Sequence, residues 1–224
     1  MITREEYCVV ACAEAFRGDG EIMVSPMGAV PKRAALLARA TFAPDILLTD
    51  GVASLVSDDG MEGWMPYRRV FETLWAGKRH VMMGSTQIDA HGNTNISCIG
   101  DWAKPKVMLL GVRGGPGNTI NHTTSYFIPR HSKKVFVPRV DVVSGIGADR
   151  AEALGAGGRF FEIRRVVSDL GVFVLRNGRL SVLSLHPGVA LEDVVEKTGF
   201  ALGIPTEIAT TRDPTPAELA ILRA

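Results

Sequence analysis

The sequence predicts an α/β protein with an open, largely parallel sheet, flanking helices and an antiparallel hairpin near the C-terminus. Short apolar runs alternate with helical patterns in the first half of the chain, which is typical of strand–helix–strand units. Near the end, two apolar runs flank Arg176-Asn177-Gly178-Arg179, and the central Asn-Gly is a strong hairpin signal. Because no linker, repeat or low-complexity segment interrupts the 224 residues, we expect one domain over residues 1–224.

Caps, prolines and apolar runs define the elements expected in the N-terminal part of the chain. A capping box of Thr3 and Glu6 begins a first helix that is expected to reach Arg17. A short strand over 22–25 precedes a second helix over 31–40, which has a proline at its start. We further expect strands at 46–49 and 81–83, a turn-rich functional loop at 51–66 and a helix at 67–76.

The C-terminal part of the chain is expected to continue the sheet. The apolar run 107–111 predicts a buried strand that opens directly into a glycine-rich turn. Further strands are expected at 136–137, 171–175 and 180–185, with helices at 191–197 and 217–223.

Asp50 is the most informative single residue, because it ends the apolar run 46–49 and precedes Gly51. A continuous apolar run indicates a strand buried on both faces, and ligands bind beyond the carboxyl ends of such strands. A partly desolvated carboxylate there is a candidate nucleophile or general base. Asp-Gly is also ordinary turn chemistry, in which Asp50 hydrogen-bonds only to its own backbone.

The second candidate segment is the glycine-rich turn that ends at Asn118. Glycines let backbone N–H groups approach an anion, so the amides of Gly114 and Gly115 are a candidate oxyanion hole. Arg113 has the charge to hold a carboxylate or phosphate, and Asn118 can line a polar pocket. The spacing is neither a dinucleotide fingerprint nor a phosphate-binding P-loop, and a plain connecting turn is the alternative.

Composition and charge exclude several classes of function. A net charge of +1 gives no electrostatic basis for binding nucleic acid or a membrane surface. No apolar stretch is long enough to span a bilayer, and the polar N-terminus is not a signal peptide. The three cysteines indicate a reducing compartment, which favours the cytoplasm. The histidines have no metal-ligand spacing, so no metal site is expected.

Four segments of the chain resemble the β subunits of family I coenzyme A transferases of the glutaconate CoA-transferase type, and they follow one another along the sequence as they do in that family. The most specific is the run 83–95, which is similar to the family's Gly-Gly-Ala-Gln-Val-Asp-x-x-Gly-Asn-x-Asn segment. The others are the strand 46–49 with its acid, the turn 114–118 and the stretch 168–173. The resemblance covers about residues 20 to 200 and implies a CoA-transferase-like fold, an acyl-CoA substrate and an obligate α partner subunit.

One departure from the family concerns the acid itself. The transferases carry a glutamate at the position of Asp50, and that glutamate attacks the acyl-CoA to form a thioester. Aspartate is shorter by about 1.5 Å, and this loss of reach is large against a reacting distance of about 3 to 3.5 Å. The chain therefore resembles a branch of the family, the actinobacterial steroid-ring-opening acyl-CoA hydrolases. Their substrate is a cyclohexenone carboxyl-CoA derived from the last rings of cholesterol.

Resemblance to that branch implies a division of labour between subunits. The α subunit is expected to carry the main catalytic glutamate, and Asp50 is expected to support it by orienting water or a partner group. No separate cofactor is expected, because coenzyme A is part of the substrate. The residues expected to contact substrate are Gly51, Arg113, Gly114, Gly115 and Asn118.

Other functions stay open from the sequence. A CoA-transferase β subunit is the main alternative, although it needs a nucleophile of full length. A non-catalytic subunit would supply only pocket walls and the subunit interface. A sugar-phosphate isomerase or a translation-factor-like member of the same broad fold is a further alternative, and the near-neutral charge weighs against nucleic-acid partners.

Overall fold

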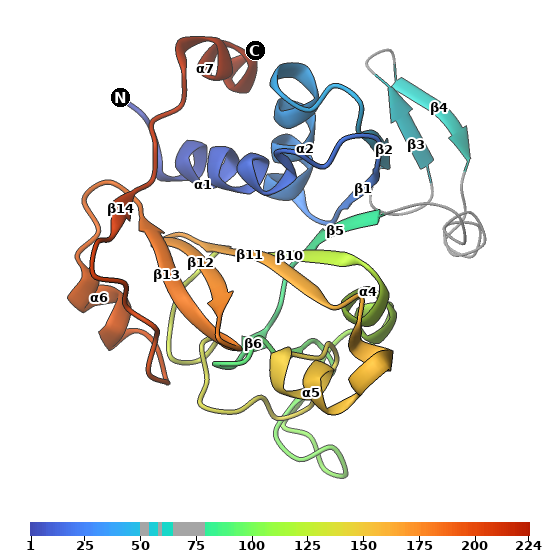
Figure 1. Ribbon diagram of the computed structural model, residues 1–224, viewed down its shortest axis with the longest axis vertical. Helices are drawn as coiled ribbons and strands as arrows, with labels where there is room; N and C mark the ends of the chain where they lie inside the picture. The colour runs from blue at the N-terminus through green and yellow to red at the C-terminus, as the bar shows by residue number, and fades with distance from the viewer. Residues whose placement is uncertain (50–53, 58–59, 65–78) are drawn as a thin grey trace. The chain divides into compact units, whose positions relative to one another are not determined.

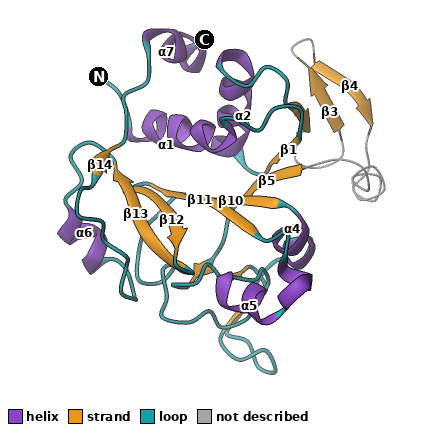
Figure 2. Ribbon diagram, viewed as in Figure 1, coloured by secondary structure: helices purple, strands orange, loops and turns teal. Residues whose placement is uncertain are grey.

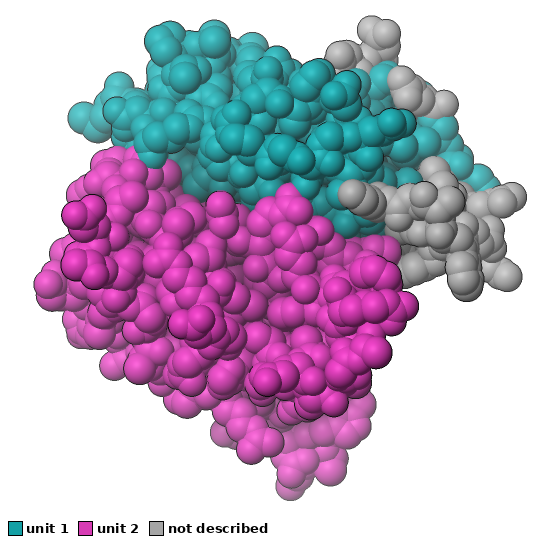
Figure 3. Space-filling view, viewed as in Figure 1, with its two compact units in different colours: residues 1–84, 212–224 teal, residues 85–211 magenta. Residues whose placement is uncertain are grey.

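The structure is a computed structural model that describes residues 1–49, 54–57, 60–64 and 79–224. The chain divides into two compact units, which Figure 3 colours separately. Unit 1 comprises Met1–Gly84 and Arg212–Ala224, and unit 2 comprises Ser85–Thr211. The single domain expected over residues 1–224 stays a prediction.

The strands of unit 1 follow the order β5–β1–β2–β3–β4 (Figure 1). Strand β1 pairs in parallel with both β2 and β5, and β3 and β4 add antiparallel neighbours beyond β2. The five strands are β1 (Met23–Pro26), β2 (Leu47–Thr49), β3 (Ser54–Ser57), β4 (Gly60–Trp64) and β5 (Arg79–Met83). The strands expected at 22–25, 46–49 and 81–83 are confirmed, with ends shifted by one or two residues.

The helices of unit 1 follow the predicted caps closely. The capping box is present, since the Thr3 amide donates to Glu6 Oε2 at 2.7 Å and the Glu6 amide donates to Thr3 Oγ1 at 3.2 Å. Helix α1 (Arg4–Ala13) continues as a 3₁₀ turn, η1 (Glu14–Phe16), so the helical stretch ends one residue before Arg17. Helix α2 (Ala29–Thr41) lies beside α1 and begins two residues before the expected proline (Figure 2).

The prediction of a turn-rich loop at 51–66 is wrong for the residues of that range that the structure describes. Residues 54–57 and 60–64 form the strands β3 and β4, because Leu55 and Val56 sit between two serines and supply the apolar side chains of a short strand. Gly60 has a φ of 121°, a conformation that glycine adopts without strain where the chain turns back. The helix expected at 67–76 lies outside the described residues.

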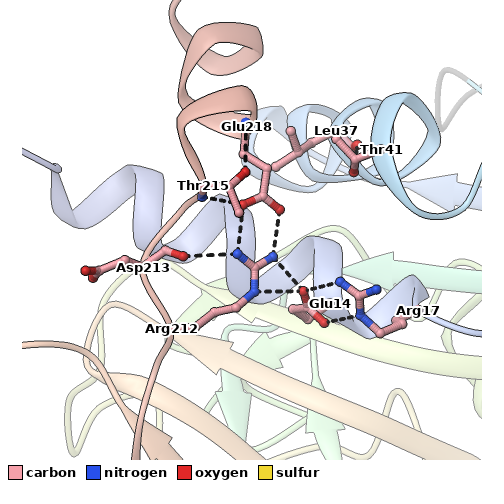
Figure 4. A network of polar contacts seen from close by, with 8 residues as sticks. All are labelled: Glu14, Arg17, Leu37, Thr41, Arg212, Asp213, Thr215 and Glu218. Atoms are coloured by element: carbon pink, nitrogen blue, oxygen red, sulfur yellow. Dashed lines mark hydrogen bonds and ion pairs between the residues drawn. The ribbon is translucent and has the colours of Figure 1, made fainter.

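Arg212 fastens the C-terminal segment of unit 1 to the end of α1 (Figure 4). Its Nη2 lies 2.6 Å from both Glu14 Oε1 and Glu218 Oε1, and its Nη1 lies 2.7 Å from Glu218 Oε2. The Arg212 guanidinium lowers the pKa of Glu218 to about 2, assisted by the Thr215 amide. Thr215 and Glu218 also form a capping box at the start of α7 (Pro216–Arg223), which confirms the expected last helix.

Unit 2 contains a sheet in the order β14–β13–β12–β11–β10. Strands β10 and β11 are parallel, β11, β12 and β13 are antiparallel, and β14 lies parallel to β13. These strands are β10 (Thr123–Ile128), β11 (Glu162–Ser168), β12 (Gly171–Arg176), β13 (Arg179–Leu185) and β14 (Ala209–Thr210). The predicted class, α/β with a largely parallel sheet and a late antiparallel hairpin, is confirmed.

The Asn-Gly hairpin forms as predicted. Arg176 pairs with Arg179, and Asn177 and Gly178 have φ angles of 50° and 71°, which is the type I′ geometry that Asn-Gly favours. The helices of unit 2 are α4 (Gly115–Asn121), α5 (Ala148–Ala153) and α6 (Leu191–Glu196), together with the 3₁₀ turn η2 (Gly155–Gly158). Helix α6 confirms the helix expected at 191–197, whereas α4 and α5 were not predicted.

Two strand predictions in unit 2 are wrong. Instead of a strand at 136–137, Phe136 makes a single bridge to Ile88. The run 107–111 forms only the two-residue strand β9 (Val107–Met108), which pairs with β8 (Cys98–Ile99). Val107, Met108 and Leu110 are 50%, 60% and 67% exposed, so this apolar run is a surface segment. Burial within the described part of this chain therefore does not explain why this run is apolar.

A buried histidine, His131, is part of the core of unit 2. Its ring stacks on Phe136 with centroids 3.6 Å apart. Its Nδ1 lies 3.0 Å from Ser168 Oγ, and its Nε2 lies 2.9 Å from Thr198 Oγ1. Burial, with a smaller contribution from the charge of Lys197, lowers the pKa of His131 to about 3. The ring is therefore neutral at physiological pH.

His131 is expected to make the free energy of unfolding fall in acid. Below pH 6.5 the unfolded chain binds a proton that the folded chain does not bind until about pH 3, so folding is progressively opposed between these values. Between pH 7 and pH 5 the wild type should lose about 2 kcal/mol more than a His131→Gln variant. Urea unfolding at both pH values measures this difference. Equal losses in the two proteins would show that His131 does not cause the acid sensitivity.

Candidate active site

Asp50 and Gly51 lie outside the described residues, but the strand before them is described. Strand β2 ends at Thr49, so Asp50 follows the end of a parallel strand in the sequence, as predicted. Thr49 Oγ1 lies 3.3 Å from Ser25 Oγ, which in turn accepts a hydrogen bond from Arg79 Nε at 2.9 Å. All three side chains are buried, so a series of polar contacts connects the neighbouring strands β2, β1 and β5.

Asp89 stabilises the turn between β6 (Gln87–Ile88) and β7 (Thr94–Asn95). Its Oδ1 accepts the backbone N–H groups of His91 and Asn93, each at 3.0 Å. Gly92 has a φ of 82° at the same turn. Burial raises the pKa of Asp89, and these hydrogen bonds oppose the shift. Asp89 thus satisfies the backbone of its own turn.

Side-chain amides of the same motif fasten the loop 138–149 to this turn. Asn93 Nδ2 donates to Asp149 Oδ1 at 2.9 Å and to Asp89 Oδ2 at 3.1 Å, while Asn93 Oδ1 accepts the Gly147 amide at 2.7 Å. Gln87 Oε1 accepts the Asp141 amide at 3.0 Å, and Gln87 Nε2 donates to Asp141 Oδ2 at 3.0 Å. The most family-specific segment is therefore a scaffold that positions a loop.

The loop 138–149 supports the glycine-rich turn. A Cβ at Gly115 would lie 2.6 Å from the Ser144 carbonyl oxygen, so this close approach requires glycine. Thr119 Oγ1, one turn further along α4, accepts the Ile146 amide at 3.1 Å. The turn and the amide-rich motif are thus parts of one connected arrangement in unit 2.

Four of the residues predicted to contact substrate lie in the glycine-rich turn, which the structure describes. Arg113 is exposed and has a φ of 44°, Gly114 is the N-cap of α4, and Asn118 is buried, with its amide donating to the Gly114 carbonyl at 2.8 Å. The Gly115 amide donates to the Val112 carbonyl at 2.9 Å. In this conformation that amide is engaged within the turn, so the oxyanion hole stays a prediction.

The sequence did not indicate a cleft of about 600 Å³ in unit 2. It is lined by Asp89, Asn93, Asp141 and Asp149, together with Arg139 and Arg150. The arginines belong to a segment without apolar periodicity, so no pattern singled them out, whereas Asp89 and Asn93 belong to the motif that carries the family resemblance. Thr123, Thr124 and Ser125 begin strand β10.

Two further observations concern the described part of the chain. No group of His, Cys, Asp and Glu residues in it is arranged to hold a metal ion. Within the same ranges, no helix has the length and apolar character needed to cross a membrane.

Comparison with known proteins gives close full-length relatives. The chain is 50% identical to the cholesterol ring-cleaving hydrolase IpdB subunit of Mycobacterium tuberculosis, over 100% of this chain and 94% of that protein. It is 31% identical to a 3-oxoadipate CoA-transferase subunit of Pseudomonas knackmussii, over 98% of this chain and 91% of that protein. No protein-family model matches the chain.

A solved structure gives the same result. The crystal structure of IpdAB from Rhodococcus jostii RHA1 matches with a TM-score of 0.94 and 46% identity, over 99% of this chain and 93% of that chain. Since both sequence and fold match from end to end, the chain belongs to the family of IpdB subunits of cholesterol ring-cleaving hydrolases, within the β subunits of the CoA-transferase superfamily.

Proposed function

We propose that this chain is the β subunit of a heteromeric acyl-CoA hydrolase that opens the last steroid ring in cholesterol catabolism. The substrate is a cyclohexenone carboxyl-CoA, and the reaction is hydrolysis of a carbon–carbon bond of its ring. The observation that carries this proposal is the 50% identity, without large gaps in coverage, to IpdB subunits. An α subunit completes the enzyme and carries the main catalytic glutamate.

The proposed reaction needs a base that activates water and hydrogen-bond donors that stabilise an enolate. Water adds to the ring carbonyl carbon, the adjacent carbon–carbon bond breaks, and its electron pair forms an enolate that is then protonated. Asp50 supports the base by orienting water or the partner's carboxylate. The turn from Arg113 to Asn118 contacts the acyl-CoA, and its Gly114 and Gly115 amides help to stabilise the enolate, which requires the Gly115 amide to exchange its Val112 acceptor for the substrate. No separate cofactor takes part.

A CoA-transferase β subunit is the second candidate, and one observation favours it. The 31% identity to a 3-oxoadipate CoA-transferase subunit extends along nearly the whole chain. Aspartate at position 50 weighs against it, because the side chain is one CH₂ shorter than the glutamate that a covalent thioester mechanism uses. A subunit without catalytic groups of its own is the remaining alternative.

We place the enzyme in the cytoplasm. All three cysteines, Cys8, Cys12 and Cys98, are buried thiols, as expected where thiols stay reduced. Acyl-CoA chemistry also belongs to that compartment.

The chain alone is expected to be inactive, because the principal base lies on the α subunit. Purified β chain should release no ring-opened product from the cyclohexenone carboxyl-CoA, while the co-expressed α and β chains should. Sedimentation and a product assay on the same samples measure assembly and activity together. Ring opening by the β chain alone would contradict the proposal.

A further inference from the structure

Exposed apolar side chains gather on one segment of unit 2. Of the fifteen large hydrophobic side chains that are exposed among the described residues, five belong to the stretch 102–112. Single exposed apolar residues are normal on a protein surface, whereas a concentrated group marks an interaction site. The five are Trp102 (61% exposed), Val107 (50%), Met108 (60%), Leu110 (67%) and Val112 (43%).

Strand β9 of the β8–β9 hairpin is exposed on both faces, whereas Cys98 on β8 is fully buried. Neighbouring residues of a strand point to opposite faces, and Val107 and Met108 are both at least half exposed. Figure 1 shows the hairpin in light green, projecting from the rest of unit 2. The apolar run therefore has no burial within the described chain that would account for it.

The segment is nevertheless held firmly by its backbone. The Leu109 and Leu110 amides donate to the Ser97 and Ile96 carbonyls at 2.9 and 3.0 Å, and the Lys106 amide donates to the Ile99 carbonyl at 2.8 Å. A preformed apolar surface binds a partner without a large ordering penalty, which is typical of stable subunit interfaces.

The location of the hairpin links it to the candidate site. Val112 is followed directly by Arg113 and the glycine-rich turn. At its other end, the Gly100 amide donates to Asp141 Oδ2 at 2.9 Å, and Asp141 lines the cleft. A protein seated on the hairpin therefore comes next to groups that the proposed function assigns to the substrate.

Charge distinguishes between the possible occupants. The hairpin and its exit carry Lys104, Lys106 and Arg113, all exposed, against the single acid Asp101. In a two-fold contact between copies of this chain, the same positive surface would meet itself, which is unfavourable. An apolar surface with an acidic rim on a different subunit complements it better.

We propose that residues 101–112 form the docking surface for the α subunit, with the apolar side chains of β9 and Leu110 at its centre and the lysines at its rim. This inference rests on the proposed function, because it takes its partner from there. A subunit docked there brings its own groups next to the glycine-rich turn, which follows Val112 directly.

The test compares Leu110→Asp with Ile204→Asp in the reconstituted α–β complex. Ile204 is 51% exposed and lies elsewhere in unit 2, so it controls for adding an acid to an exposed apolar position. Leu110→Asp should raise the dissociation constant of the complex by about tenfold or more, and Ile204→Asp should leave it within about twofold. Met108→Glu provides a second substitution on β9, and thermal unfolding of each variant reports whether it is folded.

The outcomes separate this inference from the proposed function. A wild-type complex that opens the ring, with Leu110→Asp and Met108→Glu binding α as tightly as wild type, would overturn the docking surface alone. Equal weakening by Leu110→Asp and Ile204→Asp would also overturn it, as would loss of self-association of the β chain with unchanged affinity for α. A complex that forms through Leu110 but opens no ring would leave the surface supported and the proposed function contradicted.

Discussion

Asp50→Asn is expected to lower the kcat of the α–β complex by about 100-fold, with KM and assembly little changed. A group that orients water or a partner carboxylate acts mainly in the transition state, and general acid–base groups contribute about 10²–10⁴-fold. A supporting residue should lie at the lower end of that range. Steady-state kinetics on the reconstituted complex, with sedimentation to verify assembly, measure both effects.

Asparagine and glutamate at position 50 distinguish the remaining roles. If Asp50 only forms an Asx-turn, asparagine substitutes well and activity stays within a few-fold, about 1 kcal/mol or less in activation free energy. Asp50→Glu restores the length of the transferase nucleophile, and any CoA transfer in that variant would show that side-chain length had suppressed it. Full activity of Asp50→Asn would remove Asp50 from the catalytic residues.

Asn93→Ala is expected to lower the free energy of unfolding by about 3 kcal/mol. The change removes hydrogen bonds to Asp89 and Asp149 and leaves the buried Gly147 amide without its acceptor. Asn121→Ala is the matched control, because Asn121 is exposed and its side chain donates to the Gly117 carbonyl, four residues away in the same helix. Urea unfolding of both variants measures the difference.

The loss should appear in both stability and catalysis if the motif positions the site. Because Asn93 fastens the loop that supports Gly115, the Asn93→Ala complex should also lose kcat at temperatures where it is fully folded. A loss of less than about 1 kcal/mol, or an effect equal to that of Asn121→Ala, would contradict the scaffold role.

The sequence predicted correctly those elements that are determined by residues close together in the chain. The Thr3–Glu6 capping box, the strand at 46–49 and the Asn177-Gly178 turn each depend on neighbours in the chain, and each forms as expected. The antiparallel strands at 54–57 and 60–64 escaped prediction because Ser, Asp and Gly outnumber the apolar residues between 54 and 64.

Only part of the candidate site was predicted, because some of its residues are close together in the sequence and others are not. The glycine-rich turn is contiguous, so its residues could be selected from the sequence alone. The support from Ser144 and Asp149 comes from a loop about fifty residues beyond the motif, and only the fold brings these segments together. Arg139 and Arg150, which line the cleft, belong to the same part of the chain. The apolar run 107–111 was assigned to the interior because an apolar pattern does not tell burial within a chain from burial against another.

The nature of the reaction itself is the most direct test of the central claim. The α–β complex is incubated with the cyclohexenone carboxyl-CoA in ¹⁸O-labelled water, with excess acetate and succinate as CoA acceptors, and all acyl-CoA species are identified by mass spectrometry. A ring-cleaving hydrolase gives an open-chain CoA ester with one ¹⁸O in its new carboxylate, and neither acetyl-CoA nor succinyl-CoA. Transfer of CoA to an acceptor, or a CoA ester trapped on Asp50, with the ring left intact, would contradict the account.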